Sequence, residues 1–548
     1  MRIHWAPLRK ALPTTAVRDL WRMLSLCAIV GIVAGLGAIA FYVMLDGARW
    51  FFLEYLAGYH PHPPGGEAPL FAPPATEFRR WVLLFLPALG GLIVGPIVYW
   101  LAPEAEGHGT DAAIDSYHNK GGRVRGRVPL IKALVSAITI GTGGSAGREG
   151  PIAQIGSGFG SQLASWLKLR PHERRILMAA GMAAGVGAIF HAPLAGALFA
   201  AEVFYRELDL EYEVIVPAVI SSVVAYSVFS LAFGWEPLFI TPKFVFNQPL
   251  QLVPYLILAL VVAAGAAMYT KTFYGVRDMF LRIRIPPHFK PALGGLVVGV
   301  IGYFLPEAIG TGYGLVQQAF DGHAGVWLLM AVGVGKMVTT AFSVGSGGSG
   351  GVFGPAIVIG GALGGGTGLI LADLMPWAQV QPGAFALVGM AGFFAAAANT
   401  PISTIIMVSE MTGNYHLLVP SMWVCFIGFM LCKRCTIYEK QLATRFDAPV
   451  HTGHMMKVVL QRIKVAHLVE DGGLGKLTTL REDADMASMS ELFFNNEHSS
   501  FPVLDRDGKL VSVVSYRDLW SVVDQQDLSS IVLAADLAHE PFTIEKDD

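Results

Sequence analysis

The chain has 548 residues, of which 53% are hydrophobic and 15% are charged, and its formal net charge is −2. Soluble domains carry roughly 25% charged residues, so most of this chain is expected to lie in a lipid bilayer. A near-neutral balance without a large basic block argues against nucleic-acid binding. Four cysteines do not form a disulfide framework, and Cys432-x-x-Cys435 has no second ligand pair nearby, so neither a metal site nor a resident cofactor is expected.

Residues 1–22 form a basic leader before the first apolar run. That run is long and has no clear small-residue cleavage site, so it is predicted to be a retained helix and not a signal peptide. Basic residues flank the whole apolar region: Arg2, Arg9, Lys10, Arg18 and Arg22 precede it, and Lys433, Arg434 and Lys440 follow it. The positive-inside rule then predicts that both termini are cytoplasmic.

Apolar runs long enough to cross a bilayer recur along the chain. They include Leu24 to Met44, Trp81 to Leu101, Val214 to Phe233, Leu252 to Met268 and Leu417 to Leu431. A crossing helix needs about 20 such residues, and several further runs are shorter or broken by glycine. The pattern predicts an all-α polytopic membrane protein with about ten or more membrane segments.

A glycine-rich motif occurs twice. Residues 141–151 match residues 345–355 at seven of eleven positions, and Lys132 matches Lys336 at the same offset. Residues 23–240 and 241–440 are therefore predicted to be two repeats. Paired apolar segments that are interrupted by Gly and Pro indicate broken helices, whose ends meet at a transport site between the repeats.

Each copy of the motif places a helix start after its glycines. Glu149 precedes Gly150-Pro151, and Phe353 holds the matching place in the second copy. Helix N-termini expose unpaired N–H groups and partial positive charge, so converging starts can bind an anion without Lys or Arg. A third start is expected at residues 106–111, with residues 309–313 as its repeat partner.

Glu149 is the candidate gate. Its carboxylate would compete with an anion for the same positive helix ends, and it could swing away when protonated. Ionisable residues inside membranes are costly and are usually functional. The alternative is a structural hydrogen-bonding role.

Residues 441–548 form a more charged C-terminal region. Residues 501–514 are typical of a strand, an Asp-Gly turn and a second strand, with helices expected at 486–495 and 516–523. The region resembles a CBS domain. That resemblance implies an adenine-nucleotide contact at Ser515 and Asp518. A second CBS copy is expected only to begin, at about residues 532–544. A structural cap or a truncated regulatory module is the alternative.

The membrane motifs resemble those of the CLC family of chloride channels and chloride/proton exchangers. The resemblance rests on Gly-Arg-Glu-Gly-Pro at 147–151, Gly-Val-Phe-Gly-Pro at 351–355, and His-Ala-Pro-Leu-Ala-Gly at 191–196. It implies two inverted repeats, one pore per subunit, a homodimer, and Glu149 as the gating residue. The anion contacts that it implies are His108, Gly109, Gly147, Arg148, Gly150, Val352, Phe353, Gly354 and Tyr438.

His108 departs from the family pattern, in which a serine contacts the anion. Histidine is bulkier, donates a hydrogen bond when neutral, and can become a cation near neutral pH. If the ring faces the pore, it could change selectivity or make conduction depend on pH. If it turns away, a backbone N–H replaces the serine. Chloride is the expected ion, and selectivity for another anion is the alternative.

Val203 is the second departure. Many exchangers of the family carry a proton-accepting glutamate there, and valine cannot carry a proton. Glu202 and its repeat partner Glu410 suggest a shared structural role, such as a hydrogen bond in helix packing. The sequence favours a channel-like or weakly proton-coupled protein of a bacterial-type inner or plasma membrane. A chloride/proton exchanger is one alternative, and a nucleotide-sensing membrane protein is another.

Overall fold

The computed structural model describes residues 14–451, 478–496, 498–523 and 532–541. The first thirteen residues of the expected leader, and residues 542–548, lie outside the described ranges. Contacts divide the chain into a membrane unit, Met1–His451, and a C-terminal unit, Thr452–Asp548. The expected boundary was at 440/441. Residues after it pack back on the membrane unit, where Gln441 Nε2 donates to the carbonyls of Val203 (3.1 Å) and Ala398 (2.9 Å).

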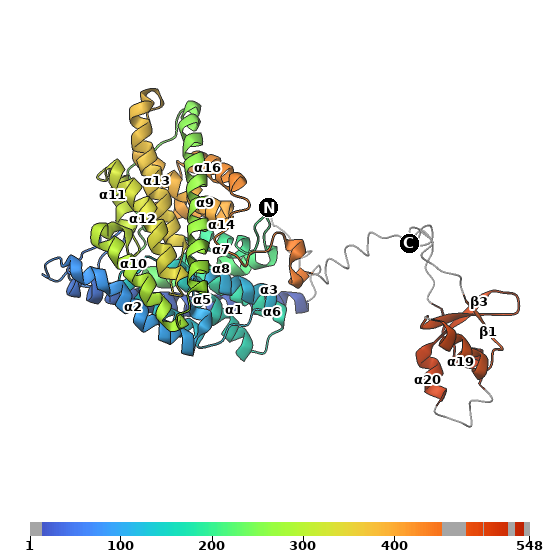
Figure 1. The fold of residues 1–548 in the computed structure, drawn as a ribbon. Coiled ribbons are helices and arrows are strands. Elements are labelled where there is room, and N and C mark those ends of the chain that lie inside the picture. Colours follow the sequence, from blue (N-terminus) through green and yellow to red (C-terminus); the bar gives the residue numbers. More distant parts are fainter. Residues whose placement is uncertain (1–13, 452–477, 497, 524–531, 542–548) are drawn as a thin grey trace, which may run out of the picture. The chain divides into compact units, whose positions relative to one another are not determined.

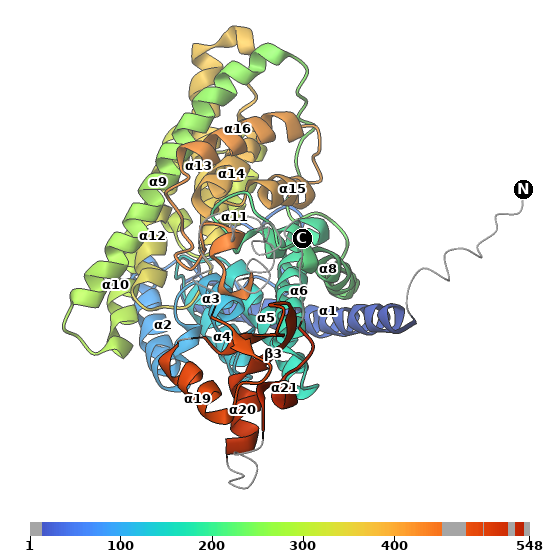
Figure 2. The same ribbon diagram turned by 90° about the vertical axis from the view of Figure 1, so that its right-hand side faces the viewer.

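In the described part of the membrane unit, sixteen α-helices form two sets of eight that follow one another in the same order. The first set is α1 (Thr14–Arg49), α2 (Arg80–Leu101), α3 (Thr110–Asn119), α4 (Val128–Gly141), α5 (Glu149–Trp166), α6 (Pro171–Ile189), α7 (Pro193–Glu202) and α8 (Tyr212–Phe233). The second set is α9 (Leu252–Arg282), α10 (Lys290–Phe304), α11 (Tyr313–Phe320), α12 (Val326–Gly345), α13 (Phe353–Leu374), α14 (Pro382–Ala398), α15 (Pro401–Thr412) and α16 (Leu418–Leu431). Because the two sets follow the same order, the sequence repeat is also a structural one. In Figures 1 and 2 the first set lies largely below the second.

The helices have the lengths and surfaces that a bilayer requires. Within the described residues, six are long and apolar enough to span: Leu20–Leu56, Arg80–Leu101, Tyr212–Phe233, Pro249–Arg282, Val326–Gly345 and Phe353–Leu374. Shorter apolar helices are Val128–Gly141, Pro193–Glu202, Pro382–Ala398 and Leu418–Leu431. Large apolar side chains such as Trp327, Leu231 and Met430 are exposed, as contact with lipid would require. The prediction of a polytopic, mostly helical protein is confirmed.

Glycines allow the repeat-related helix pairs to pack closely. In the α5–α6 pair, a Cβ at Gly156 would lie 2.1 Å from the carbonyl oxygen of Gly181, and the reverse distance is the same. In the α13–α14 pair, Gly360 and Gly389 stand in the same mutual relation at 2.5 Å. Small residues at such contacts let helix backbones approach in membranes. The high glycine content therefore serves the same packing in both repeats.

The C-terminal unit is a small α/β fold. Its three-stranded sheet has the order β1 (Leu480–Arg481), β2 (Ser500–Leu504) and β3 (Leu510–Ser515), with β1 parallel and β3 antiparallel to β2. Its helices are α19 (Met486–Asn495), α20 (Tyr516–Val523) and α21 (Ala534–Leu537), and Figure 1 shows α19 and α20 beside the sheet. The expected strand, Asp-Gly turn and strand are confirmed, and Gly508 has a positive φ of 79° in the turn.

Ser515 and Asp518 bond to each other at the start of α20. The Asp518 carboxylate accepts from the Ser515 N–H (2.9 Å) and hydroxyl (2.5 Å), half of a capping box. Partial burial acts in the opposite direction, but these bonds and the neighbouring His539 lower the pKa of Asp518. Residues 532–541, where a second CBS copy was expected to begin, pack on this same unit, since the Ala534 N–H donates to Ala484 O (2.9 Å).

Candidate anion site and gate

The turns before the broken helices of the two repeats are joined by main-chain hydrogen bonds. Gly147 N donates to Gly351 O and Gly351 N donates to Gly147 O, both at 2.7 Å. Beside this bridge, Gly107 N donates to Gly348 O (2.9 Å), and Gly350 N donates to Gly107 O (3.2 Å). The starts of α3, α5 and α13 therefore converge, and they bring unpaired N–H groups and positive dipole ends to one place.

The side chain of Glu149, at the start of α5, lies where these helix starts converge. Its side chain is buried, and its Oε2 accepts from the Gly354 N–H at 3.1 Å, at the start of α13 in the other repeat. Its Oε1 accepts from the hydroxyl of Tyr313, the first residue of α11. A carboxylate thus occupies a position that a helix N-terminus offers to an anion.

The other backbone groups of the expected anion site lie around Glu149. The Gly147 amide is already engaged in the bridge, and the Val352 carbonyl accepts from the Tyr269 hydroxyl (3.1 Å). The Phe353 ring packs on Phe394, with ring centroids 4.0 Å apart. These contacts fix the α13 start.

Gly109 and Gly150 hold the α3 and α5 starts close together. Gly109 precedes α3 with a φ of 85°, a left-handed value that glycine adopts without strain. A Cβ at Gly150 would lie 2.0 Å from the carbonyl oxygen of His108. Neither position has room for a side chain.

The His108 ring lies beside Tyr438. Their ring centroids are 5.4 Å apart, and His108 Nε2 is 3.2 Å from Asp111 Oδ2. Among the described residues, no hydrogen-bond partner reaches His108 Nδ1 or the Tyr438 hydroxyl, both of which are buried, although Thr110 lies next to that hydroxyl. Two buried polar atoms without partners therefore lie in one small region.

Two buried lysines, Lys132 and Lys336, bond to the turns that precede α3 and α11. The sequence repeat matches these lysines but does not predict a role for them. Lys132 Nζ donates to the carbonyls of Ala105 (3.0 Å) and Gly107 (2.7 Å). Lys336 Nζ donates to the Gly310 carbonyl (2.9 Å) and lies 3.3 Å from the Ser145 hydroxyl. Each lysine thus holds the turn before α3 or α11 in its own repeat.

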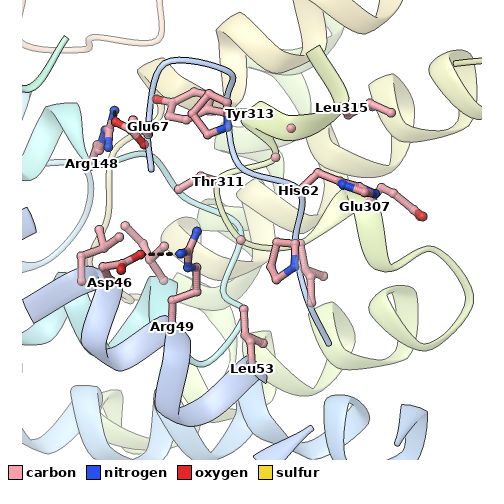
Figure 3. Close-up of a pocket in the computed structure, with 18 of the residues that line it drawn as sticks. Asp46, Arg49, Leu53, His62, Glu67, Arg148, Glu307, Thr311, Tyr313 and Leu315 are labelled. Carbon is pink, nitrogen blue, oxygen red and sulfur yellow. Dashed lines mark hydrogen bonds and ion pairs between the residues drawn. The ribbon is translucent and has the colours of Figure 1, made fainter. Parts of the chain in front are cut away.

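Arg148 faces a pocket beside the gate. Its guanidinium bonds to Glu67 at 2.5 Å and lies over the rings of Tyr42 (5.5 Å) and Tyr313 (5.4 Å). Figure 3 shows Arg148, Glu67 and Tyr313 together at one end of this pocket of about 840 Å³, part of which is open to solvent. The ion-pair partner of the Arg148 guanidinium is therefore a carboxylate. Glu67 belongs to no repeated glycine motif, and the sequence does not predict a role for it. Tyr313 ends the repeated segment 309–313, but that repeat does not predict its contact with Glu149.

Glu202 and Glu410 each cap the start of a helix in the other repeat. Glu202, the last residue of α7, accepts from the N–H groups of Ile402 (3.0 Å) and Ser403 (2.8 Å) at the start of α15. Glu410 in α15 accepts from the N–H groups of Leu194 (3.3 Å) and Ala195 (2.8 Å) at the start of α7. The adjacent side chain, at Val203, is fully buried in the apolar core.

Two repeats of broken helices that meet around buried polar groups define a membrane transport protein with its substrate path between the repeats. The family described as "Voltage gated chloride channel" matches residues 90–433, and the CBS domain matches residues 475–519. The chain belongs to the CLC family of chloride channels and chloride/proton exchangers, whose members are channels or transporters, and its function is CLC-type anion transport.

Known relatives agree with this assignment. The chain is 32% identical over 411 residues to the H(+)/Cl(-) exchange transporter ClcA of Yersinia pestis, covering 74% of this chain and 83% of that protein. It is 30% identical over 435 residues to a ClcB-like protein of Ralstonia nicotianae, covering 78% and 97%. In fold it is similar to a slow cyanobacterial Cl-/H+ antiporter, with a TM-score of 0.66 at 22% identity over 80% of this chain and 99% of that one.

Proposed function

We propose that the chain conducts chloride through one pore in each subunit of a homodimer, and that the Glu149 carboxylate gates this pore. The observation that supports the proposal is the hydrogen bond from the Gly354 N–H to Glu149, because the carboxylate there takes the place of an anion. Protonation would weaken its hold on the positive helix ends, so the side chain could leave and an anion could enter.

We infer that the anion passes the residues that surround this point. They are His108, Gly109, Gly147, Arg148, Gly150, Val352, Phe353, Gly354 and Tyr438. The unpartnered Tyr438 hydroxyl is a donor that an anion can accept from, and the His108 ring beside it favours the alternative in which histidine faces the pore. Chloride is the proposed ion, and His108 is where selectivity for another anion would arise.

Val203 favours channel-like or weakly proton-coupled conduction. It is buried among apolar groups, and the neighbouring carboxylate of Glu202 is bonded to the α15 start. Chloride/proton exchange is the second candidate. It is favoured by the exchange activity that the name of the Yersinia pestis relative states.

We further infer that both termini lie in the cytoplasm of a bacterial-type inner or plasma membrane. The C-terminal unit then acts on the cytoplasmic side as a regulatory module. Ser515 and Asp518 bond to each other, so a nucleotide that contacted them would have to share or replace these bonds.

Flux measurements on purified protein in liposomes test the gate and the coupling together. External chloride and pH are recorded under an outward chloride gradient, for the unaltered chain and for Glu149→Gln. Passive chloride efflux that increases several-fold in the variant, with no proton movement, supports the gated channel. Inward proton movement against its own gradient, abolished by the variant, supports exchange. Unchanged flux and coupling in the variant would contradict a gating role for Glu149.

A further inference from the structure

We propose that Tyr313 is a positioning residue that holds the Glu149 carboxylate in its closed position and so sets the pH at which the gate opens. This inference rests on the proposed gating role of Glu149. The Tyr313 hydroxyl donates to Glu149 Oε1 while the Gly354 N–H donates to Oε2. Both oxygens of the carboxylate are therefore held by donors from the second repeat.

The Tyr313 hydroxyl is held firmly in place. Tyr313 is buried, follows Gly312 with its left-handed φ of 81°, and meets the Phe239 ring edge-on at 5.8 Å. On another side the Arg148 guanidinium lies 5.4 Å from the ring centroid, and Glu67 fixes that guanidinium through an ion pair. The loop that carries Glu67 thus supports the donor.

Several other charged or titratable groups face Glu149. Arg148 precedes it in the chain, and Lys336 of α12, Tyr269 of α9 and Tyr438 after α16 interact with it electrostatically. Their hydrogen bonds go elsewhere: Lys336 donates to Gly310, Tyr269 to Val352, and Arg148 to Glu67. Among the described residues, Tyr313 is the side chain that donates to the carboxylate.

The direction of the pH effect follows from the donor. A hydroxyl that donates to a carboxylate favours the ionised form over the protonated one. In the proposed mechanism the ionised form is closed, so Tyr313 stabilises the closed gate. Without this hydroxyl, a lower proton concentration is enough to protonate Glu149 and open the gate, so half-maximal flux moves to higher pH.

Tyr313→Phe tests this by removing one oxygen while keeping the ring that contacts Arg148. Chloride flux is measured in liposomes between about pH 4 and 9, a range that brackets the ordinary carboxyl pKa, with equal pH on both sides. The variants are Tyr313→Phe, Glu149→Gln and the double variant. The control is Tyr255→Phe in α9, which removes the hydroxyl of a buried tyrosine whose ring stacks on Phe385 of α14. Elution as a single species in detergent verifies folding.

We expect Tyr313→Phe to shift the pH of half-maximal flux upward by about one unit, the size of one charge-assisted hydrogen bond. The shift should be absent in the Glu149→Gln background and in Tyr255→Phe. If Glu149→Gln increases flux while Tyr313→Phe leaves the pH profile unchanged, the positioning role is overturned and the gate stands. If Tyr313→Phe changes flux equally with and without Glu149, its role is structural. If Glu149→Gln changes nothing, both proposals are wrong.

Discussion

Glu202 and Glu410 show how a single residue type can serve both repeats. Each carboxylate accepts from the N–H groups of the second and third residues of the helix that begins with Pro401 or Pro193, respectively. Those N–H groups have no partner within their own helix, and an acidic group at a helix start also interacts favourably with the dipole. The repeat suggests a shared structural role for this pair, a hydrogen bond in helix packing, and the observed bonds to helix N–H groups agree with it.

Replacing either carboxylate should destabilise the membrane unit. We expect Glu202→Ala and Glu410→Ala each to cost about 2 kcal/mol or more, because each leaves two helix N–H groups unpaired. Glu202→Ala should cost more, since the Ser403 hydroxyl also bonds to Glu202 at 2.6 Å. Thermal unfolding in detergent measures the difference. Loss of proton coupling without loss of stability in Glu202→Ala would instead assign Glu202 to a proton path.

At the scale of elements, the decisive feature is how closely the helix starts approach. A side chain at Gly150 would meet the His108 carbonyl at 2.0 Å and the Gly351 Cα at 3.0 Å. Both obstacles are backbone atoms and cannot rotate away. The order of α3, α5 and α13 around the site therefore depends on glycine at the first turn of α5.

Gly150→Ala should prevent this arrangement. Overpacking in a close contact costs about 1–3 kcal/mol or more, and here it would separate the helix starts, so flux should fall to background. The matched control is Gly275→Ala in α9, where an added Cβ would contact nothing within 4 Å. Size-exclusion profiles and chloride flux compare the two. Normal flux in Gly150→Ala would mean that the α5 start tolerates a displacement that the structure does not predict.

Across the whole membrane unit, the two repeats also share a buried lysine at matching positions. Lys132 and Lys336 are both fully buried, and each donates to carbonyls of the turn before α3 or α11. Their equivalence indicates that the corresponding turn in each repeat needs a buried lysine as a hydrogen-bond donor.

Lys132→Met and Lys336→Met should therefore destabilise the protein by similar amounts. Each buried polar group left without a partner costs about 1–3 kcal/mol, so each variant should unfold at clearly lower temperature. Lys271→Met, at an exposed position of α9, is the control and should unfold normally. A large effect of only one of the two buried lysines would show that the repeats are not supported in the same way.

The sequence predicted the parts of this structure that depend on local patterns. Apolar runs and repeated glycine motifs identified the membrane helices and the starts of α5 and α13, because these signals lie within a few residues of each other. The bond from Tyr313 to Glu149 joins residues 164 positions apart. Both residues lie in repeated motifs, but neither motif predicts that these two side chains are in contact. The return of charged residues after 440 predicts a domain boundary there, whereas contacts divide the chain at His451 and Gln441 packs inside the membrane unit. The anion contacts themselves stay predictions.

The paired bonds between Gly147 and Gly351 have a consequence for how an ion can cross. Many transporters expose their site alternately by rocking one repeat against the other. Here the two repeats share main-chain bonds at the proposed anion site, so such a rocking motion would break these bonds. We therefore expect the scaffold to stay fixed during transport, with the opening produced by rotation of individual side chains.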